Sequence, residues 1–399
     1  MQSCSWRHAL GAGYVSSTRE ASADAANVLR EFNLENFMTN FFETRRQLLQ
    51  TIATGSALAW TGQVAAKSSS LKPVKIGQIG TKHAHAAGQA STIRKLSQHY
   101  ELLGVVEPDE AQRKRMETRP EYQGVNWMTE EELLNCSGLE AVAVETEVKD
   151  LLDVAQRCVN AGLHVHLDKP AGESWNALET LHRTASEKNR VIQMGYMFRY
   201  NPGFQFIFRA VREGWLGNIF EIHGVMSKTS PAPVRHKLAN YEGGTMFELG
   251  CHLIDPLLHI MGPPDQVTGY VRKTRPKQDN LNDNMLAVLE YPRATATVRS
   301  ALVEVRGSRR RQFVICGDKG TIVVRPLEPP ELILTLAKPL GEFQSGSQRV
   351  SLPTGAGRYD GTFLDMHQVI RGEKQHDFSH EHDLAVQRTI LQACQLGFA

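Results

Sequence analysis

Short apolar runs alternate with amphipathic stretches over residues 71–194, and this alternation sets the predicted fold of the first half of the chain. Apolar runs of strand length separate segments whose apolar residues recur at helical spacing. Strands that alternate with helices are typical of a doubly wound parallel sheet. We expect strands at residues 74–80, 102–106, 139–144, 164–167 and 191–194, helices at residues 86–98, 149–160 and 174–188, and a short helix that opens with a capping box at residues 129–132.

Residues 195–399 show a different pattern, in which strand-like runs follow one another between glycine, proline and charged turns. This pattern predicts an open-faced, mostly antiparallel sheet with helices on one face. We expect strands at residues 219–225, 266–273, 284–291, 295–303, 312–316 and 321–324, helices at residues 204–213, 362–370 and 383–396, and a long loop or irregular hairpin at residues 326–357. An exposed sheet face favours a homodimer or homotetramer.

Residues 1–70 resemble an export signal rather than part of a folded domain. Arg45 and Arg46 precede two leucines, a mildly apolar stretch at residues 51–60, and the small residues 64–66. A charged region, a short apolar region and a cleavage site form a secretory signal, and paired arginines are typical of the twin-arginine type. The alternative is a fortuitous arginine pair on an N-terminal helix. The sequence thus predicts an exported, periplasmic protein whose folded domains span residues 71–194 and 195–399.

The composition excludes several classes of partner. The 399 residues are 41% hydrophobic and 22% charged, with a formal net charge of +2. This balance favours neither nucleic acid nor acidic membranes, and no apolar run is long enough to span a bilayer. The six cysteines form no CxxC pair. His376, His380 and His382 lie near acidic residues but lack further ligands at fixed spacing. We therefore predict no metal site.

The first predicted turn carries a partial dinucleotide-binding pattern. In a doubly wound sheet the first strand–helix turn binds a pyrophosphate at a helix N-terminus. Gly77 and Gly80 are present, whereas His83 occupies roughly the place of the third glycine. Glu107 ends the second strand, where a carboxylate accepts from ribose hydroxyls and repels a 2′-phosphate. The pattern favours NAD, with NADP possible, and the alternative is an empty crevice. His83 and His85 could contact phosphate or substrate, or be solvated loop residues.

Two further stretches carry candidate chemistry. Lys169, in Asp168-Lys169-Pro170, follows a strand at the sheet edge where ligands bind, so it could stabilise a developing alkoxide. In residues 243–258, Thr245 and Glu248 predict a capping box. Glu248, His252 and Asp255 share one face of the predicted helix. An imidazole one turn from a carboxylate suits proton transfer. The alternatives are a surface lysine, a helix cap and an interior histidine.

Taken together, these stretches resemble the glucose–fructose oxidoreductase / inositol dehydrogenase / rhizopine-catabolism (Gfo/Idh/MocA) family. The resemblance rests on the first glycine turn, Asp168-Lys169-Pro170, residues 199–202 (Arg-Tyr-Asn-Pro), and the segment from Gly243-Gly244 to Asp255. It implies a Rossmann domain followed by a sheet domain. The implied roles are catalysis by Lys169, His252 and Glu248; cofactor binding by Gly77, Ile79, Gly80, Glu107, Thr146 and Lys169; and substrate binding by His83, Arg199, Tyr200 and Asp255.

These predictions lead to one main hypothesis and two rivals. The main hypothesis is an exported oxidoreductase that transfers a hydride between a nicotinamide and a sugar, polyol or sugar derivative. His252 would take the hydroxyl proton, Glu248 would orient the imidazole, and Lys169 would stabilise negative charge. One rival is an NAD-dependent glycosidase with transient oxidation. The other is a non-catalytic protein that binds a sugar or a partner on the same scaffold.

Overall fold

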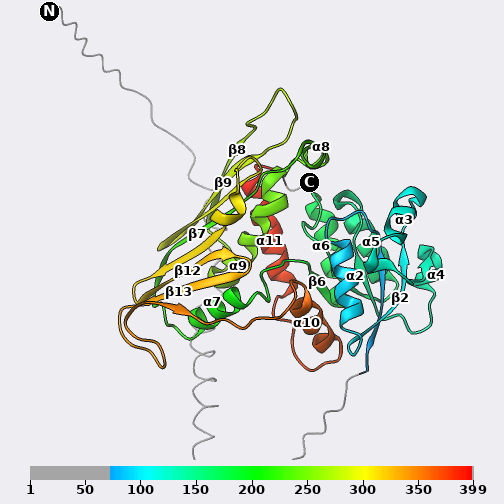
Figure 1. Ribbon diagram of the computed structural model, residues 1–399, viewed down its shortest axis with the longest axis horizontal. Coiled ribbons are helices and arrows are strands. Elements are labelled where there is room, and N and C mark those ends of the chain that lie inside the picture. Colours follow the sequence, from blue (N-terminus) through cyan, green and yellow to red (C-terminus); the bar gives the residue numbers. More distant parts are fainter. Residues whose placement is uncertain (1–71, 398–399) are drawn as a thin grey trace, which may run out of the picture. The chain divides into compact units, whose positions relative to one another are not determined.

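The computed structural model describes residues 72–397, which contain two β-sheets with helices packed on them (Figure 1). The predicted export signal lies outside the described residues. Within the part of the chain that the structure describes, no helix has both the length and the apolar character needed to cross a membrane.

The first sheet is entirely parallel, which confirms the predicted doubly wound fold. Its spatial order is β3-β2-β1-β4-β5-β6. The strands are β1 (Val74–Ile79), β2 (Tyr100–Val106), β3 (Trp127–Met128), β4 (Ala141–Val144), β5 (His164–Leu167) and β6 (Ile192–Met194). Strands β2 and β3 lie on one side of β1, and the chain then crosses to β4 on the other side of β1. Ligands bind at the carboxyl ends of the strands at such a reversal.

Helices connect the strands of this sheet. They are α2 (Ala86–Lys95), α3 (Glu110–Glu117), α4 (Glu130–Leu134), α5 (Leu151–Asn160) and α6 (Trp175–Glu187), with short 3₁₀ turns η1 (Pro120–Tyr122) and η2 (Val148–Asp150). The predicted capping box at the start of α4 is confirmed, because Thr129 and Glu132 each bond the other's backbone amide. The apolar pattern did not predict α3, since it buries only Gln112.

The second sheet is mixed and mostly antiparallel, as predicted. Its order is β14-β13-β12-β11-β7-β10-β9-β8, and only the neighbours β7 and β10 run parallel. The strands are β7 (Ile219–Ser227), β8 (Gln266–Arg272), β9 (Asn284–Tyr291), β10 (Ala294–Ala301), β11 (Gln312–Gly317), β12 (Gly320–Leu327), β13 (Pro330–Leu336) and β14 (Gly346–Val350).

Of the two forms predicted for residues 326–357, a long loop or an irregular hairpin, the structure has the hairpin. Strands β13 and β14 form there and extend the sheet by antiparallel pairing. Leu332, Leu334 and Leu336 alternate inward on β13 and are buried. The prolines and glycines that surround this alternation lie at the strand ends, so they mark turns rather than a structureless loop.

Helices α7, α9 and α11 cover one face of the second sheet (Figure 1). The helices and helical turns of this half are α7 (Pro202–Arg212), α8 (Ala232–Leu238), the π-helical turn η3 (Met246–Gly250), α9 (Cys251–Met261), the 3₁₀ turn η4 (Gly307–Arg310), α10 (Asp360–Ile370) and α11 (His380–Ala393). Gly224 allows α9 to approach the sheet, because a Cβ there would lie 3.1 Å from Leu253 Cδ1.

Helix α10 belongs by sequence to the second predicted domain, residues 195–399, but it packs on the first. Instead of packing on the second sheet, it lies beside α2 (Figure 1). Phe363 and Met366 join the core formed by β1, β2 and β4, and the Tyr100 hydroxyl donates to the Phe363 carbonyl at 2.7 Å. Arg371 pairs with Glu140 at 2.7 Å. The C-terminal segment therefore completes the first domain.

Candidate functional site

The turn between β1 and α2 brings the backbone of the first strand close to that of β4. Gly80 has a φ of +90°, and a Cβ there would lie 2.7 Å from the Thr146 nitrogen. Only glycine fits this conformation and this approach. The following residue, Thr81, donates from its backbone N–H (2.9 Å) and its hydroxyl (2.6 Å) to Glu107 Oε2. The turn is therefore fixed to the end of β2.

A cleft of about 580 Å³ opens beside this turn. Four of the predicted cofactor-binding residues line it, namely Ile79, Gly80, Glu107 and Thr146. Val106, Trp127 and Val154 contribute apolar walls. These residues fit a dinucleotide: the walls suit an adenine, Glu107 suits a ribose, and the turn suits a pyrophosphate.

Gly77 has a different role from the predicted one. A Cβ at this position would lie 2.6 Å from Leu133 Cδ2, so the missing side chain makes room for the core side chain of α4. Because Gly77 serves packing between β1 and α4, we withdraw its predicted contact with the cofactor.

Lys169 reaches from the end of β5 to the turn that precedes α9. Its Nζ donates to the Glu248 carbonyl at 3.0 Å and lies 3.8 Å from Glu248 Oε2. Lys228 Nζ lies 2.7 Å from Glu248 Oε1. Burial raises the pKa of Glu248, but the two ammonium groups outweigh burial and lower it to about 2. Lys169 and Glu248, two predicted catalytic residues from distant parts of the chain, are therefore in contact.

The predicted support of His252 by Glu248 is wrong in this structure. His252 Nδ1 has no hydrogen-bond partner among the described residues, whereas the Glu248 carboxylate faces the two lysines. The predicted capping box is also wrong, because the Thr245 hydroxyl is unpaired and Met246–Gly250 is a π-helical turn. A π-turn adds a residue per turn, so the α-helical spacing does not hold across it.

His252 lies 2% exposed on α9, among aromatic rings. Its ring centroid is 6.3 Å from that of Tyr196, 6.0 Å from that of Phe198 and 6.5 Å from that of His85. Burial, followed by the positive charge of Lys169, holds the pKa of His252 well below its usual value. The imidazole is therefore neutral and can accept a proton.

Arg199 and Asp255, both predicted to bind substrate, are instead fully buried partners. Arg199 Nη2 lies 2.7 Å from Asp255 Oδ1 and 2.5 Å from Asp383 Oδ1. His382 Nε2 adds a contact to Asp255 at 3.0 Å. Because these ion pairs join the loop before α7 to α9 and α11, we assign them a structural role. Tyr200 is half-buried and lines a second cleft of about 690 Å³.

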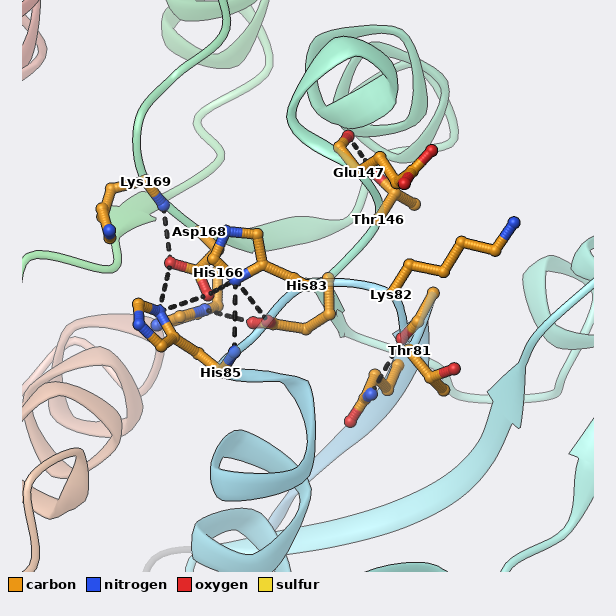
Figure 2. Close-up of polar contacts among 12 residues, drawn as sticks. Thr81, Lys82, His83, His85, Thr146, Glu147, His166, Asp168 and Lys169 are labelled. Atoms are coloured by element: carbon orange, nitrogen blue, oxygen red, sulfur yellow. Dashed lines mark hydrogen bonds and ion pairs between the residues drawn. The ribbon is translucent and has the colours of Figure 1, made fainter. Parts of the chain in front are cut away.

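A polar cluster lies under the first turn, at the carboxyl ends of β1, β4 and β5. Figure 2 shows the imidazoles of His83 and His85 directed at the carboxylate of Asp168. His83 Nδ1 lies 2.8 Å and His85 Nδ1 3.0 Å from Asp168 Oδ2. Glu145 and His166, both 0% exposed, complete the cluster, with His83 Nδ1 3.8 Å from Glu145 Oε2. We name residues 83, 85, 145, 166 and 168 the histidine–carboxylate cluster.

Of this cluster, the sequence predicted His83 as substrate-binding and left the role of His85 open, whereas Glu145, His166 and Asp168 were not predicted as site residues. Glu145 directly follows the four buried residues of β4, and Asp168 directly follows β5. A carboxylate at the end of a buried strand, opposite a His-x-His turn, was the available signal. Lys228, which directly follows β7 and pairs with Glu248 from 20 positions away, was also missed.

Comparison with protein-family models identifies both halves of the chain. Residues 74–196 match the model of the Gfo/Idh/MocA oxidoreductase family, described as an NAD-binding Rossmann fold. Residues 204–323 match the GFO/IDH/MocA C-terminal domain. Together the two matches span more than half of the chain.

Curated relatives and solved structures agree with this family. The chain is 30% identical over 183 residues to the NADP-dependent scyllo-inositol 2-dehydrogenase IolW of Bacillus subtilis, which covers 45% of this chain and 51% of that one. It is 26% identical to the uncharacterized oxidoreductase YhhX of Escherichia coli, over 55% of this chain and 62% of that one. The chain thus spans between a half and two thirds of these two relatives.

A solved structure of aldose-aldose oxidoreductase from Caulobacter crescentus has the same fold, with a TM-score of 0.69. The two sequences are 17% identical, and the match covers 81% of this chain and 98% of that one.

Proposed function

Because the chain belongs to the Gfo/Idh/MocA family of NAD(P)-binding oxidoreductases, we propose that it transfers a hydride between a nicotinamide cofactor and the CH–OH carbon of a sugar, polyol or sugar derivative. The observation that carries the proposal is the hydrogen bond from Lys169 Nζ to the Glu248 carbonyl at 3.0 Å, on the turn that leads into the helix of His252. This contact places an ammonium and a neutral imidazole at the carboxyl end of the parallel sheet.

Each side chain has a separate role in this proposal. The nicotinamide, when bound, accepts the hydride. Neutral His252 takes the proton of the substrate hydroxyl. Lys169 donates a hydrogen bond to the oxygen on which negative charge develops. Glu248 holds the Lys169 ammonium in its charged form, since its carboxylate lies 3.8 Å away. This role replaces the predicted orientation of His252 by Glu248.

We infer that NAD is preferred over NADP. Glu107 is 6% exposed on the cleft and still has lone pairs free beyond its bonds to Thr81 and the Asp109 amide. A ribose hydroxyl can donate to it, whereas a 2′-phosphate would meet a like charge. Reduction of NAD⁺ and NADP⁺ in the same assay compares the two cofactors.

Replacing Lys169 with methionine is expected to lower kcat about 100-fold, because the substituted side chain fills similar space but cannot donate to an oxyanion. The measurement is NADH formation over a panel of sugars and polyols. Lys228→Met is the matched control, since Lys228 contacts the same carboxylate from the other side. We expect Lys228→Met to stay within about tenfold of wild type.

Three outcomes would contradict this assignment. Equal losses in the two lysine variants would mean that the charge on Glu248, rather than a contact with substrate, sets the rate. Glycoside cleavage without net NADH would replace the proposal with the NAD-dependent glycosidase. Failure of the purified protein to retain or bind NAD(H) would instead favour a non-catalytic binding protein.

We propose that the protein forms a homo-oligomer through the face of the second sheet that α7, α9 and α11 do not cover. Val314 and Val323 pair across β11 and β12 on this face, and Ile333 follows on β13 with 40% exposure. Val323→Lys is expected to convert a dimer or tetramer into monomers, as measured by light scattering coupled to size-exclusion chromatography. A wild-type protein that is already monomeric would overturn the proposal.

We also propose export to the periplasm through the twin-arginine route. The support is the Arg45–Arg46 pair ahead of the apolar stretch and the small residues at 64–66. Replacing both arginines with lysines is expected to leave the protein in the cytoplasm, as measured by cell fractionation. Unchanged periplasmic recovery of the double variant would exclude this route.

A further inference from the structure

We propose that the histidine–carboxylate cluster is a binding site for a divalent first-row transition-metal ion, with His83, His85, Asp168 and Glu145 as its ligands. No such site follows from the family match or from the proposed hydride transfer. The sequence predicts no metal site, because these residues are separated by up to 85 positions in the chain. The parallel sheet brings them together, since β1, β4 and β5 are adjacent and end at the same edge.

The geometry of the ligand atoms is the first support. One ligand atom from each of His83, His85 and Asp168 lies within 4.8 Å of the other two. Both Nδ1 atoms lie 2.8–3.0 Å from the same carboxylate oxygen, Asp168 Oδ2. Metal–ligand bonds of about 2.0–2.2 Å place neighbouring ligand atoms roughly 3 Å apart. The three side chains therefore need only small movements to surround one ion.

Glu145 is the second, independent support. It is 0% exposed, and neither of its carboxylate oxygens has a hydrogen-bond partner among the described residues. Its Oε2 lies 3.8 Å from His83 Nδ1 and its Oε1 lies 3.8 Å from His166 Nδ1, so the unpaired carboxylate lies between these two imidazoles. A buried polar group without a partner is costly, and a carboxylate beside a second carboxylate is more so. A divalent cation would compensate both Glu145 and Asp168.

The ligand types indicate which ion would bind. Two imidazole nitrogens and two carboxylate oxygens suit Zn²⁺, Fe²⁺, Co²⁺ or Mn²⁺, whereas Ca²⁺ and Mg²⁺ favour oxygen ligands alone. His166 Nδ1 lies 3.8 Å from Glu145 Oε1, beyond hydrogen-bond distance. Among the ligands, His85 is the most accessible, with a side chain 20% exposed, so a further ligand would approach from its side.

The site adjoins the proposed catalytic residues. Asp168 Oδ1 accepts from the Lys169 amide at 2.6 Å, and the His85 and His252 rings are 6.5 Å apart. A bound cation could act there as a Lewis acid toward a substrate oxygen. That role rests on the proposed function, whereas metal binding itself does not.

The test measures Zn²⁺ binding to the full-length protein. The protein is treated with a chelator, dialysed, and titrated with zinc chloride against a chromophoric competitor, and its bound zinc is counted by mass spectrometry. We expect one zinc ion per chain. His85→Ala and Glu145→Gln are expected to weaken binding by at least about 100-fold and about 10-fold, respectively. Glu145→Gln keeps the shape of the side chain, so it separates loss of a ligand from loss of folding.

His382→Ala is the matched control, because His382 belongs to the other group of potential ligands in the described residues, with Asp255 and Asp383. This variant should bind zinc like the wild-type protein. Substitution by Co²⁺ should give a visible d–d spectrum that His85→Ala abolishes. The proposal is overturned if the wild-type protein retains no zinc, if the cluster variants bind it unchanged, or if His382→Ala loses it. None of these readouts depends on turnover, so failure here leaves the proposed hydride transfer untouched.

Discussion

Replacing His252 with alanine is expected to lower kcat by about 10²–10⁴-fold, the range for removal of a general base. The charge of Lys169 helps to lower the pKa of His252 on α9, and His252 Nδ1 has no competing partner among the described residues. The measurement is the initial rate of NADH formation with the best substrate of the panel, together with the binding of NADH by fluorescence. NADH binding should change little, because the dinucleotide cleft lies on the first domain.

His259→Ala provides the control for this experiment. His259 lies on the same helix but packs against Phe208 and Phe378, away from Lys169. We expect its replacement to leave kcat within a few-fold of wild type. Turnover by His252→Ala at the wild-type rate would remove this residue from the mechanism.

The pH dependence gives a second check on His252. Burial and the charge of Lys169 lower its pKa well below the usual value of 6.5. The imidazole is therefore already deprotonated across the neutral range. A plot of the wild-type rate against pH should therefore show no inflection near pH 6.5 that belongs to His252. Such an inflection would mean that the residue carries a proton in the resting protein.

Arg199→Met is expected to destabilise the protein by about 3–5 kcal/mol, because it leaves Asp255 and Asp383 buried without their cation. The guanidinium is 0% exposed and joins α9 to α11 through Asp255 and Asp383. The measurement is chemical unfolding followed by circular dichroism. Burial raises the pKa of Asp383 even with Arg199 present, and without Arg199 both carboxyls should tend to bind protons.

Two comparisons test this explanation. Arg349→Met removes an ion pair with Glu331 in which the arginine side chain is 79% exposed, and it should cost less than about 1 kcal/mol. Combining Arg199→Met with Asp255→Asn and Asp383→Asn should recover part of the lost stability, since no unpaired charge remains. A loss below about 1 kcal/mol for Arg199→Met alone would contradict the assigned structural role.

Local patterns predicted the fold well. The alternation at residues 284–291 gave β9 with its observed ends, and the apolar runs gave the five longest strands of the parallel sheet. Helix α3 was not predicted because it buries only Gln112, so its sequence carries little apolar periodicity. The pairing partners of β13 could not be predicted either, because burial by a partner strand is not a local property.

The candidate site was predicted less completely. Lys169 and the Glu248 turn come together as expected, since both follow motifs with a defined place in the fold. The partners of Arg199, however, lie 56 and 184 positions away, and no local spacing encodes which carboxylate an arginine meets. The π-turn at residues 246–250 also changes the direction of Glu248, and an assumed α-helix could not reveal this.

The placement of α10 limits how this protein can be divided. A fragment that ends at residue 194 would leave Val74, Tyr100 and Ala143 without the Phe363 and Met366 side chains that now cover them. Such a nucleotide-binding half, expressed alone or exchanged with that of a relative, would carry a bare apolar surface. Exchange of the nucleotide-binding half by recombination would therefore have to carry the gene segment for α10 with it. Otherwise α10 would have to pack on the first sheet of a different protein.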